Sequence, residues 1–377
     1  MMSILNIEER TSSNNDKYRE YREENGIFTD PEKSRFLTDE YIQYLVNEYQ
    51  FQEWNLTFIK TISEYFDLEG KTVLEIGGSN IPRDIIINKF KVKKWVCVDI
   101  PYWDEASNPR QHNEIKQFDF LTKLDDVWEE NDYFLFRGYT DNITLEFHNK
   151  FDICFSLACL EHVQNLLYAL NVIYDCLKSN GFFYTHWGPI WGSAYGSHFF
   201  VDTPGKWLTC LEPDFLPPFL HLLKSRKDIY NILFEKYGDH PKLEQWSSQI
   251  KGDSTFVNRY FYEDYEYFLE KCKFESKIIV PFYQDIDVET KEKLCDIYGG
   301  GYKEFEAGAA LIMAVKKPQK VKQEMKKPHS RIPAPIPKDE QKLSAFLETI
   351  PTKLLLRKLI KRFIPKRMWV ALRRMKR

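Results

Sequence analysis

Short apolar runs alternate with helical stretches through the middle of the chain. Residues 71–77 (KTVLEIG) form an apolar run that ends in glycine, and residues 94–100 (KWVCVDI) form a second one with an acid at its end. Continuous apolar runs of this length are typical of strands that are buried on both faces. Further strands are predicted at 114–120, 151–157, 182–187, 277–283 and 309–315, and helices at 82–90 and 166–177. Strands separated by helices indicate βαβ units, so we predict an α/β fold with a doubly wound, Rossmann-like, mostly parallel sheet.

The segments around this alternating region have other patterns. Residues 1–35 are polar and charged, and we expect them to be loosely ordered or to form a cap. Apolar residues recur at helical spacing from 38 to 65, which predicts one or two leading helices. Residues 201–270 are rich in Pro and aromatic residues, with helical stretches at 219–237 and 263–272, and predict an inserted helical, aromatic-rich cap over the active face. The predicted division is 1–54 (polar segment and leading helix), 55–317 (main domain), 318–342 (Pro/Lys-rich linker) and 343–377 (basic amphipathic helix).

The charge of the chain is divided unevenly. The net charge is −3, yet the 62 residues from Lys316 to Arg377 hold twenty basic and four acidic residues, so the preceding residues carry −19. Within 343–377, Leu, Phe, Met and Trp recur at helical spacing with Lys and Arg between them. Such a helix is typical of an interfacial membrane anchor, although docking on a protein or nonspecific nucleic-acid binding would use the same pattern. The acidic body makes nucleic acid an unlikely ligand of the main domain.

Composition points to the cytoplasm, with the tail peripheral at the inner face of the membrane. The N-terminus has no basic, apolar signal pattern, and the chain contains no run of 18 apolar residues. None of the seven cysteines forms a C-x-x-C pair, so we interpret them as reduced core thiols, and we predict no metal site. Composition does not indicate an oligomeric state.

A candidate nucleoside site follows the first predicted strand. Gly77 and Gly78 allow a sharp turn and close approach of a ligand, and Asp99 ends the next strand, where an acid can bind both ribose hydroxyls. The loop lacks the G-x-G-x-x-G pattern that a dinucleotide pyrophosphate requires. Glu75, two residues before the first glycine, suits a cationic or amino-bearing ligand. An NAD-dependent oxidoreductase is therefore disfavoured.

These residues resemble motif I of class I S-adenosylmethionine-dependent methyltransferases. Residues 151–163 (FDICFSLACLEHV) are similar to the fourth-strand motif of the family's type 11 members, and residues 177–181 (LKSNG) to the turn before the fifth strand. The resemblance covers roughly residues 70–187. It implies S-adenosyl-L-methionine as cofactor, and it implies that cofactor contacts come from Glu75, Gly77, Gly78, Ser79, Asp99, Asp119, Ser156 and Leu157.

Residues 184–199 leave the fifth predicted strand at the active face and carry His186 and His198. Methyl transfer to a hydroxyl needs alignment and a base, and imidazole titrates near neutral pH, so these are the candidate catalytic residues, with His198 preferred. Either histidine could instead bond loop backbone. Trp187, Trp191 and Tyr195 could stack on an acceptor or pack beneath the cap. Glu161 and His162 are also consistent with a helix N-terminus.

The loop at 188–198 is similar to methyltransferase-like proteins encoded with bacterial surface-polysaccharide genes, which implies O-methylation of a sugar, glycan or related small metabolite. A non-catalytic, membrane-associated scaffold with the same fold is the alternative.

Overall fold

The computed structural model describes residues 7–49, 51, 53–77, 81–100, 116–119, 123–124, 128, 132–203, 206–209, 216–252 and 257–318. Contacts divide the chain into two compact units, Met1–Lys320 and Val321–Arg377. Everything below concerns the first unit. The predicted helix at 343–377, and all but the first residue of the predicted linker at 318–342, lie outside the described residues. No helix in the described ranges is long and apolar enough to cross a membrane.

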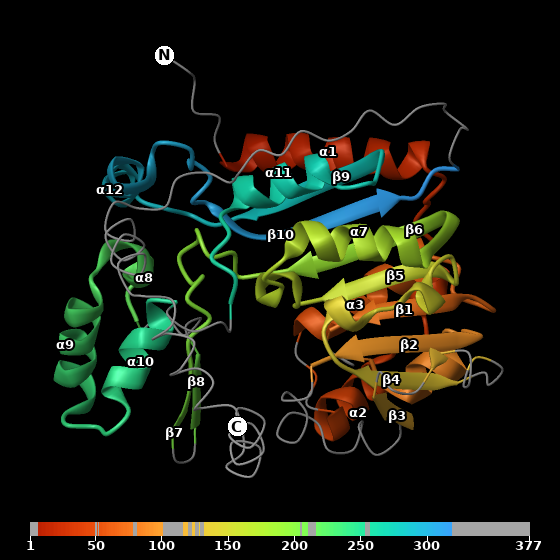
Figure 1. The fold of residues 1–377 in the computed structure, drawn as a ribbon, viewed down its shortest axis with the longest axis horizontal. Helices are drawn as coiled ribbons and strands as arrows, with labels where there is room; N and C mark the ends of the chain where they lie inside the picture. The colour runs from red at the N-terminus through yellow and green to blue at the C-terminus, as the bar shows by residue number, and fades with distance from the viewer. Residues whose placement is uncertain are drawn as a thin grey trace, which may run out of the picture. The chain divides into compact units, whose positions relative to one another are not determined.

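The core is an eight-stranded sheet with the order β3-β4-β2-β1-β5-β6-β10-β9 (Figure 1). The strands β3, β4, β2, β1, β5 and β6 pair in parallel, and β10 is antiparallel to both of its neighbours. The predicted α/β fold with a mostly parallel sheet is confirmed. The strands are β1 (Thr72–Ile76), β2 (Lys94–Asp99), β3 (Lys116–Asp119), β4 (Tyr133–Arg137), β5 (Phe151–Leu157), β6 (Leu177–Trp187), β9 (Ser276–Tyr283) and β10 (Ala307–Val315).

Strand β4 was not predicted from the sequence. The run at 114–120 does contain a strand, β3, but the sequence analysis missed β4, which lies between β2 and β3. The run YFLFR has only five residues, too few for a periodic pattern to separate a strand from other buried segments. The strand beside β2 is therefore β4, and Asp119 lies on β3, the next strand outward.

Helices cover both faces of the sheet, which confirms the doubly wound arrangement. Apolar side chains of α1 (Ile7–Glu24), α2 (Asp39–Tyr49), α3 (Glu53–Tyr65) and the short π-helix η2 (Ile85–Lys89) pack on one face. Side chains of α7 (Leu166–Cys176) and α11 (Tyr262–Lys271) pack on the other. The predicted helix at 82–90 is thus shortened to η2, and the one at 166–177 is confirmed.

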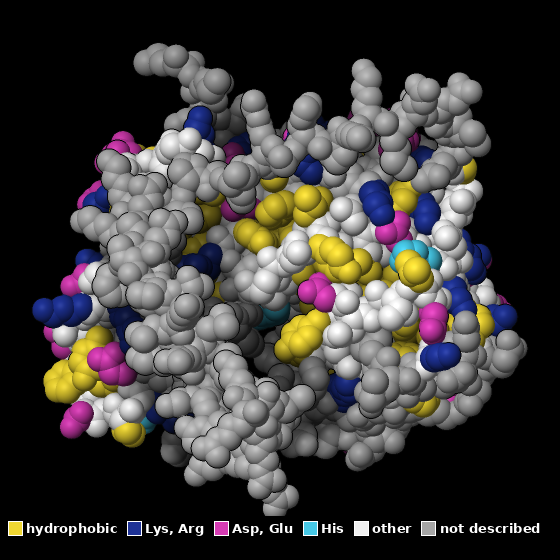
Figure 2. Space-filling view, viewed as in Figure 1, with side chains coloured by type: hydrophobic (Ala, Val, Ile, Leu, Met, Phe, Trp, Pro, Cys, Tyr) yellow, Lys and Arg dark blue, Asp and Glu magenta, His cyan; other side chains and the backbone are white. Residues whose placement is uncertain are grey.

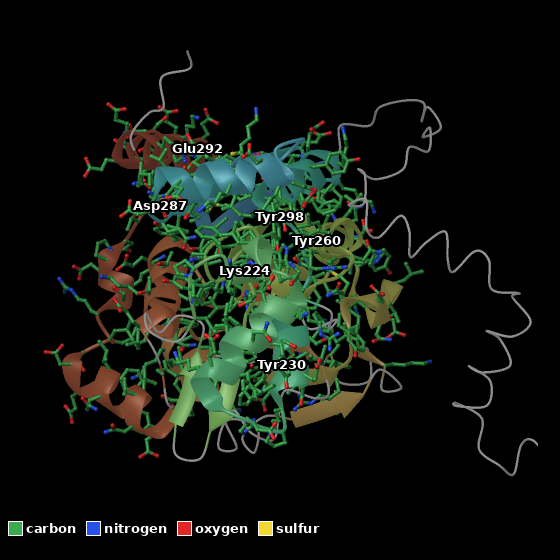
Figure 3. All side chains as sticks on the ribbon, turned by 90° about the vertical axis from the view of Figure 1, so that its left-hand side faces the viewer. Lys224, Tyr230, Tyr260, Asp287, Glu292 and Tyr298 are labelled. Carbon is green, nitrogen blue, oxygen red and sulfur yellow. The ribbon has the colours of Figure 1, made fainter. Side chains whose placement is uncertain are left out.

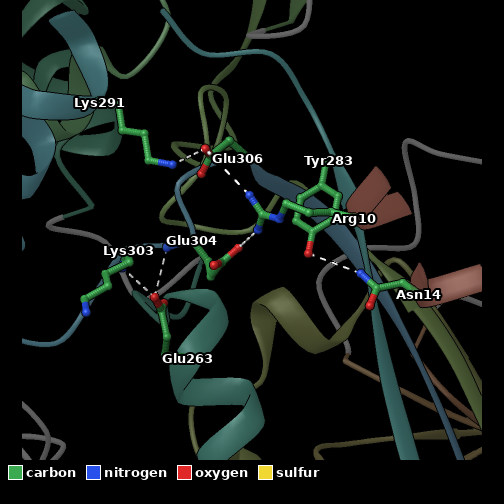
Figure 4. A network of polar contacts seen from close by, with 8 residues as sticks. All are labelled: Arg10, Asn14, Glu263, Tyr283, Lys291, Lys303, Glu304 and Glu306. Carbon is green, nitrogen blue, oxygen red and sulfur yellow. Dashed lines mark hydrogen bonds and ion pairs between the residues drawn. The ribbon is translucent and has the colours of Figure 1, made fainter. Parts of the chain in front are cut away.

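The N-terminal segment is more regular than predicted. Residues 7–24 form α1, whose Arg10 forms an ion pair with Glu304 and lies 4.1 Å from the centroid of the Tyr283 ring (Figure 4). Asn14 donates to the Tyr283 hydroxyl at 3.2 Å. Over its described part the segment is thus a regular helix rather than a loosely ordered one, and its charged and aromatic residues bind β9 and the residues just before β10.

The cap is inserted after β6. It contains the hairpin β7 (Phe200–Thr203) and β8 (Lys206–Thr209), followed by the helices α8 (Leu220–Leu223), α9 (Arg226–Tyr237) and α10 (Leu243–Ile250), with a core of its own. Tyr298 of α12 (Val288–Tyr298) donates to Leu222 O at 3.2 Å on the side viewed in Figure 3. The predicted boundary at 270 is too late, because α11 packs on the sheet with α7.

Candidate functional site

The carboxyl ends of β2, β1, β5 and β6 lie side by side. The chain passes from β1 to β2 on one side and returns on the other side of β1 as β5, so the strand order reverses between β1 and β5. In open α/β sheets the crevice at such a reversal is where ligands bind. The molecule is hollowed between the sheet and the cap, and histidine side chains are visible in the hollow (Figure 2).

Gly77 makes the turn at the end of β1. Its φ is +75°, and its N–H donates to Val98 O at 2.8 Å. A Cβ at this position would lie 2.2 Å from Cys159 Sγ, so no other residue fits without rearrangement. The glycine predicted from the sequence is therefore required both by its backbone conformation and by close packing against the segment after β5.

Asp99 is the last residue of β2 and is buried, with only 7% of its surface exposed. Its Oδ1 accepts from the backbone N–H of Ile100 at 2.8 Å, which orients the carboxylate at the strand end. The backbone bond between Gly77 and Val98, the residue before Asp99, brings the predicted turn and the predicted acid together.

Glu75 belongs to β1 and is buried in the sheet below the loop. It is 1% exposed, and its Oε2 accepts hydrogen bonds from Trp95 Nε1 at 2.8 Å and from the Tyr133 hydroxyl at 3.4 Å. Burial, together with the Glu75 carboxylate, raises the pKa of Tyr133 well above its usual value, so the phenol remains a donor. Trp95 and Tyr133 thus hold the Glu75 carboxyl group in place below the Gly77 turn.

The other predicted cofactor residues are placed as follows. Ser156 is fully buried and its Oγ donates to Ile76 O at 2.8 Å, which ties β5 to the end of β1. Leu157 packs in the core. Asp119 is paired with Arg137 of β4, which is paired in turn with Asp99, so it lies at the same edge of the sheet but two strands from Asp99. Gly78, Ser79 and the side chain of Asp119 lie outside the described residues.

Cys159 connects this end of the sheet to a second group of side chains. Burial raises the pKa of its thiol, and the carboxyl groups of Asp99, Glu161 and Glu75 raise it further, so the residue stays neutral. Cys159 therefore lies near the carboxyl groups of all three residues. The sequence analysis gave this cysteine no role beyond the core.

That second group consists of Glu161, His162 and His198. Each offers one ligand atom, and these atoms lie within 4.8 Å of one another. Glu161 and His162 belong to the short 3-10 helix η5 (Leu160–His162) after β5, and His198 comes from the loop after β6. The rings of His162 and His198 meet edge to face with centroids 5.2 Å apart. The sequence analysis predicted no such cluster, because its members come from two loops and their spacing in the chain matches no metal motif.

Glu161 is almost completely buried, with 3% of its surface exposed. Its Oε1 accepts from Gly188 N at 3.4 Å, whereas its Oε2 has no hydrogen-bond partner within the part of the chain that the structure describes. Burial raises the pKa of this carboxyl to about 8. Glu161 lies in the first turn of the short helix η5, as the sequence suggested, but its side chain is buried.

His198 has a positive φ of 48° and lies 6% exposed. Its Nε2 is 2.6 Å from Pro189 O. A carbonyl only accepts, so Nε2 carries the proton of the neutral ring. Burial and the neighbouring His162 lower the pKa of His198 to about 3, so the imidazole is neutral at physiological pH.

His186 is separate from this cluster. It is the residue before the end of β6, where it pairs with Leu157 and Leu311, and its ring lies 4.9 Å from that of Phe282 on β9. Burial lowers the pKa of His186. The structure therefore brings His198 together with Glu161 and His162 rather than with the second histidine predicted from the sequence.

Asn258 fixes the turn that carries Glu161 and His162. Its Nδ2 donates to Leu160 O at 2.6 Å and to Val163 O at 3.0 Å, and its backbone N–H donates to Glu161 O at 2.7 Å. Tyr265 of α11 in turn donates to Asn258 Oδ1 at 3.0 Å. Asn258 was not predicted, since a single Asn near an aromatic segment gives no signal in the sequence.

The aromatic residues after β6 mostly pack beneath the cap. Trp187 is 1% exposed and lies 4.9 Å from the ring of Tyr265, and Trp191 is 7% exposed beside His221. Packing beneath the cap, one of the two interpretations of these residues, is confirmed for Trp191, whereas Trp187 packs in the main core against α11. Tyr195 is half-buried and contacts the apolar cores of the cap.

No protein-family model and no curated protein matches the chain. Similar solved structures are S-adenosylmethionine-dependent methyltransferases at low sequence identity. The Haemonchus contortus phosphoethanolamine N-methyltransferase 2 complex with S-adenosyl-L-methionine is 14% identical, with 70% of this chain and 52% of that chain covered and a TM-score of 0.36. A methyltransferase from Mesorhizobium loti is 11% identical (69% and 97% covered, TM-score 0.36). One from Archaeoglobus fulgidus is 13% identical (74% and 100% covered, TM-score 0.34).

The order of the strands in the sheet is a separate observation. When the edge strand β3 is left out and the remaining seven are renumbered along the chain, the order is 3-2-1-4-5-7-6 with strand 7 antiparallel. This order is typical of the class I methyltransferase fold.

Proposed function

We propose that this protein is an S-adenosylmethionine-dependent methyltransferase. The observation that carries the proposal is the joint placement of Gly77 and Asp99 where the strand order reverses. A tight glycine turn lets the ligand approach the backbone, and a buried carboxylate at the next strand end can accept both hydroxyls of a ribose.

The charge of the site favours this cofactor over a dinucleotide. The carboxyl groups of Glu75 and Asp99 lie near the Gly77 turn, and both act on Cys159. A sulfonium is a cation, so carboxylates attract it, whereas the pyrophosphate of NAD would be repelled by the same charges. An oxidoreductase is disfavoured on the same ground.

The acceptor side is the Glu161, His162 and His198 cluster between the sheet and the cap. We propose a hydroxyl acceptor, from a sugar, glycan or related small metabolite, because such a group must lose a proton as it attacks the methyl carbon. A base works best when its pKa lies near the pH of the reaction. His198, with a pKa of about 3, does not meet this condition.

A turnover assay tests the proposal. Purified protein is incubated with S-adenosylmethionine and pools of hydroxyl-bearing sugars, and formation of S-adenosylhomocysteine is followed. We expect turnover with at least one pool, and its loss in Asp99→Asn. If the protein binds the donor but the Glu161→Gln variant turns over at the wild-type rate, the acceptor assignment fails while the cofactor assignment stands.

The basic tail bears on where the protein acts. We propose that residues 343–377 hold the protein at an anionic membrane surface, since each basic residue near such a surface adds about 1 kcal/mol. The support for this part is the alternation of apolar and basic residues in the sequence alone.

A further inference from the structure

We propose that Glu161, His162 and His198 bind one divalent transition-metal ion, in a site of the zinc type with an open position. Two imidazoles and one carboxylate form a donor set that zinc uses in catalytic sites, where three protein ligands leave a position for water or substrate. The three ligand atoms already lie within 4.8 Å of one another. Bonds of about 2.0–2.2 Å to a common ion require only a small contraction of the cluster.

The carboxylate of Glu161 supplies the first independent observation. The residue is 3% exposed, and within the described ranges its Oε2 has no hydrogen-bond partner. A buried polar atom without a partner costs free energy, and a cation at the cluster would provide the missing interaction. The oxygen belongs to the same cluster as the two imidazole rings, so one ion can serve all three groups.

The orientation of His198 supplies the second observation. The ring donates from Nε2 to Pro189 O, so in the neutral ring the lone pair is on Nδ1. Histidines that bind metals generally donate their other N–H to a carbonyl or carboxylate, which fixes the tautomer and the ring plane. His198 has this arrangement on a backbone of positive φ, which is uncommon for a residue other than glycine.

The turn that carries the other two ligands is held in place by Asn258 and by Tyr265 of α11. Asn258 bonds the carbonyl oxygens of Leu160 and Val163 through its side chain and that of Glu161 through its backbone. Tyr265 orients Asn258. Ligands that are fixed by a supporting shell lose little entropy when the ion binds. The site is therefore preorganised by residues that do not touch the ion.

The role of the ion in the reaction rests on the proposed function. A cation in this position supplies Lewis acidity, which lowers the pKa of an acceptor hydroxyl. The hydroxyl oxygen attacks the methyl carbon of the sulfonium, the new O–C bond forms as the S–C bond breaks, and the thioether leaves uncharged. The hydroxyl proton passes to water. On this view neither His186 nor His198 acts as the base.

Calorimetric titration with Zn²⁺ alone tests the site. Tag-free, full-length protein is stripped with a chelator and titrated without methyl donor or acceptor. We expect one ion per chain, and at least about tenfold weaker binding in Glu161→Gln and in His198→Gln. The matched control is His148→Gln, which removes a half-buried imidazole outside the cluster and should bind like the wild type. Wild-type affinity in both cluster variants, or no binding by the wild-type protein, overturns the proposal.

Two further measurements keep the result interpretable. Melting of each stripped variant shows whether it is folded, and Zn²⁺ should raise the melting temperature of the wild type and of His148→Gln alone. Co²⁺ bound to the wild-type protein should show visible bands of a low-symmetry site, and the spectrum of the free aqueous ion would overturn the assignment without any variant. S-adenosylhomocysteine binding is measured on the same stripped protein, so failure of the metal site and failure of the methyltransferase proposal are distinguished.

Discussion

Gly77 and Cys159 come from the ends of two adjacent strands, and a Cβ at Gly77 would lie 2.2 Å from the Cys159 sulfur. The two residues therefore determine the shape of the turn at which the cofactor is proposed to bind. Gly77 also has a φ of +75°, a conformation that costs other residues about 1–2 kcal/mol. Strain and steric exclusion act at the same position.

Substitution of Gly77 by Ala should show the effect of the close contact with Cys159 separately from the effect of backbone strain. We expect Gly77→Ala to weaken S-adenosylhomocysteine binding at least about tenfold, because the turn must move away from Cys159. The matched control is Gly70→Ala, where φ is +70° but a Cβ meets nothing within 4 Å. Both variants should lose stability in thermal melts, and only Gly77→Ala should lose affinity. Equal affinities in the two variants would contradict the role of this turn.

Asn258 should act on the acceptor side without affecting the donor. Its Nδ2 satisfies two carbonyl oxygens of the turn that carries Glu161 and His162, and loss of such bonds to a buried turn costs about 1–3 kcal/mol. We expect Asn258→Ala to lower methyl-transfer turnover and Zn²⁺ affinity about tenfold or more, with S-adenosylhomocysteine affinity unchanged.

Tyr265→Phe removes only the hydroxyl that orients Asn258 and should give a smaller effect in the same direction. Parallel titrations with Zn²⁺ and S-adenosylhomocysteine make the comparison. A common loss of both affinities in Asn258→Ala would show that the variant has lost the fold rather than the acceptor side.

The sequence predicted most of the sheet, and the reasons for its failures are local. Continuous apolar runs made β1, β2 and β5 evident, and the glycine and acid at their ends identified the Gly77–Asp99 pair. The strand β4 was missed, and it lies between β2, which carries Asp99, and β3, which carries Asp119. The Glu161 cluster depends on two loops meeting beneath the cap, a tertiary contact that no spacing in the chain reveals.

The cap should lose stability in acid because of His221. This histidine is 2% exposed, contacts Trp191 O through Nε2 at 2.7 Å, and burial lowers its pKa from 6.5 to about 4. Between those pH values the unfolded chain binds a proton that the folded chain does not, so stability is full above pH 6.5 and falls as the pH drops toward 4. The loss from this residue is about 3 kcal/mol.

Urea denaturation followed by tryptophan fluorescence between pH 7.5 and 4 measures this loss. His221→Gln has no titrating ring and should show a shallower decline, although it starts from a lower stability. If wild type and variant decline in parallel, His221 does not control the acid sensitivity of the cap.

The basic tail should control binding to membranes. We expect a chain that lacks residues 343–377 to remain in solution when sedimented with anionic liposomes, while the full-length chain sediments with them. Neutral liposomes and high salt are the controls, since screening weakens electrostatic attraction. Sedimentation of the truncated protein with anionic vesicles would show that another surface makes the contact.

Calorimetric titration of the full-length protein with S-adenosylhomocysteine, with NAD titrated in parallel, tests the central claim most directly. We predict saturable binding of S-adenosylhomocysteine at one site per chain, no binding of NAD, and at least about tenfold weaker binding of S-adenosylhomocysteine by Asp99→Asn, whose amide cannot accept both ribose hydroxyls. Absence of S-adenosylhomocysteine binding, or wild-type affinity in Asp99→Asn, would contradict the assignment of the Gly77–Asp99 site and would favour a non-catalytic role for this fold.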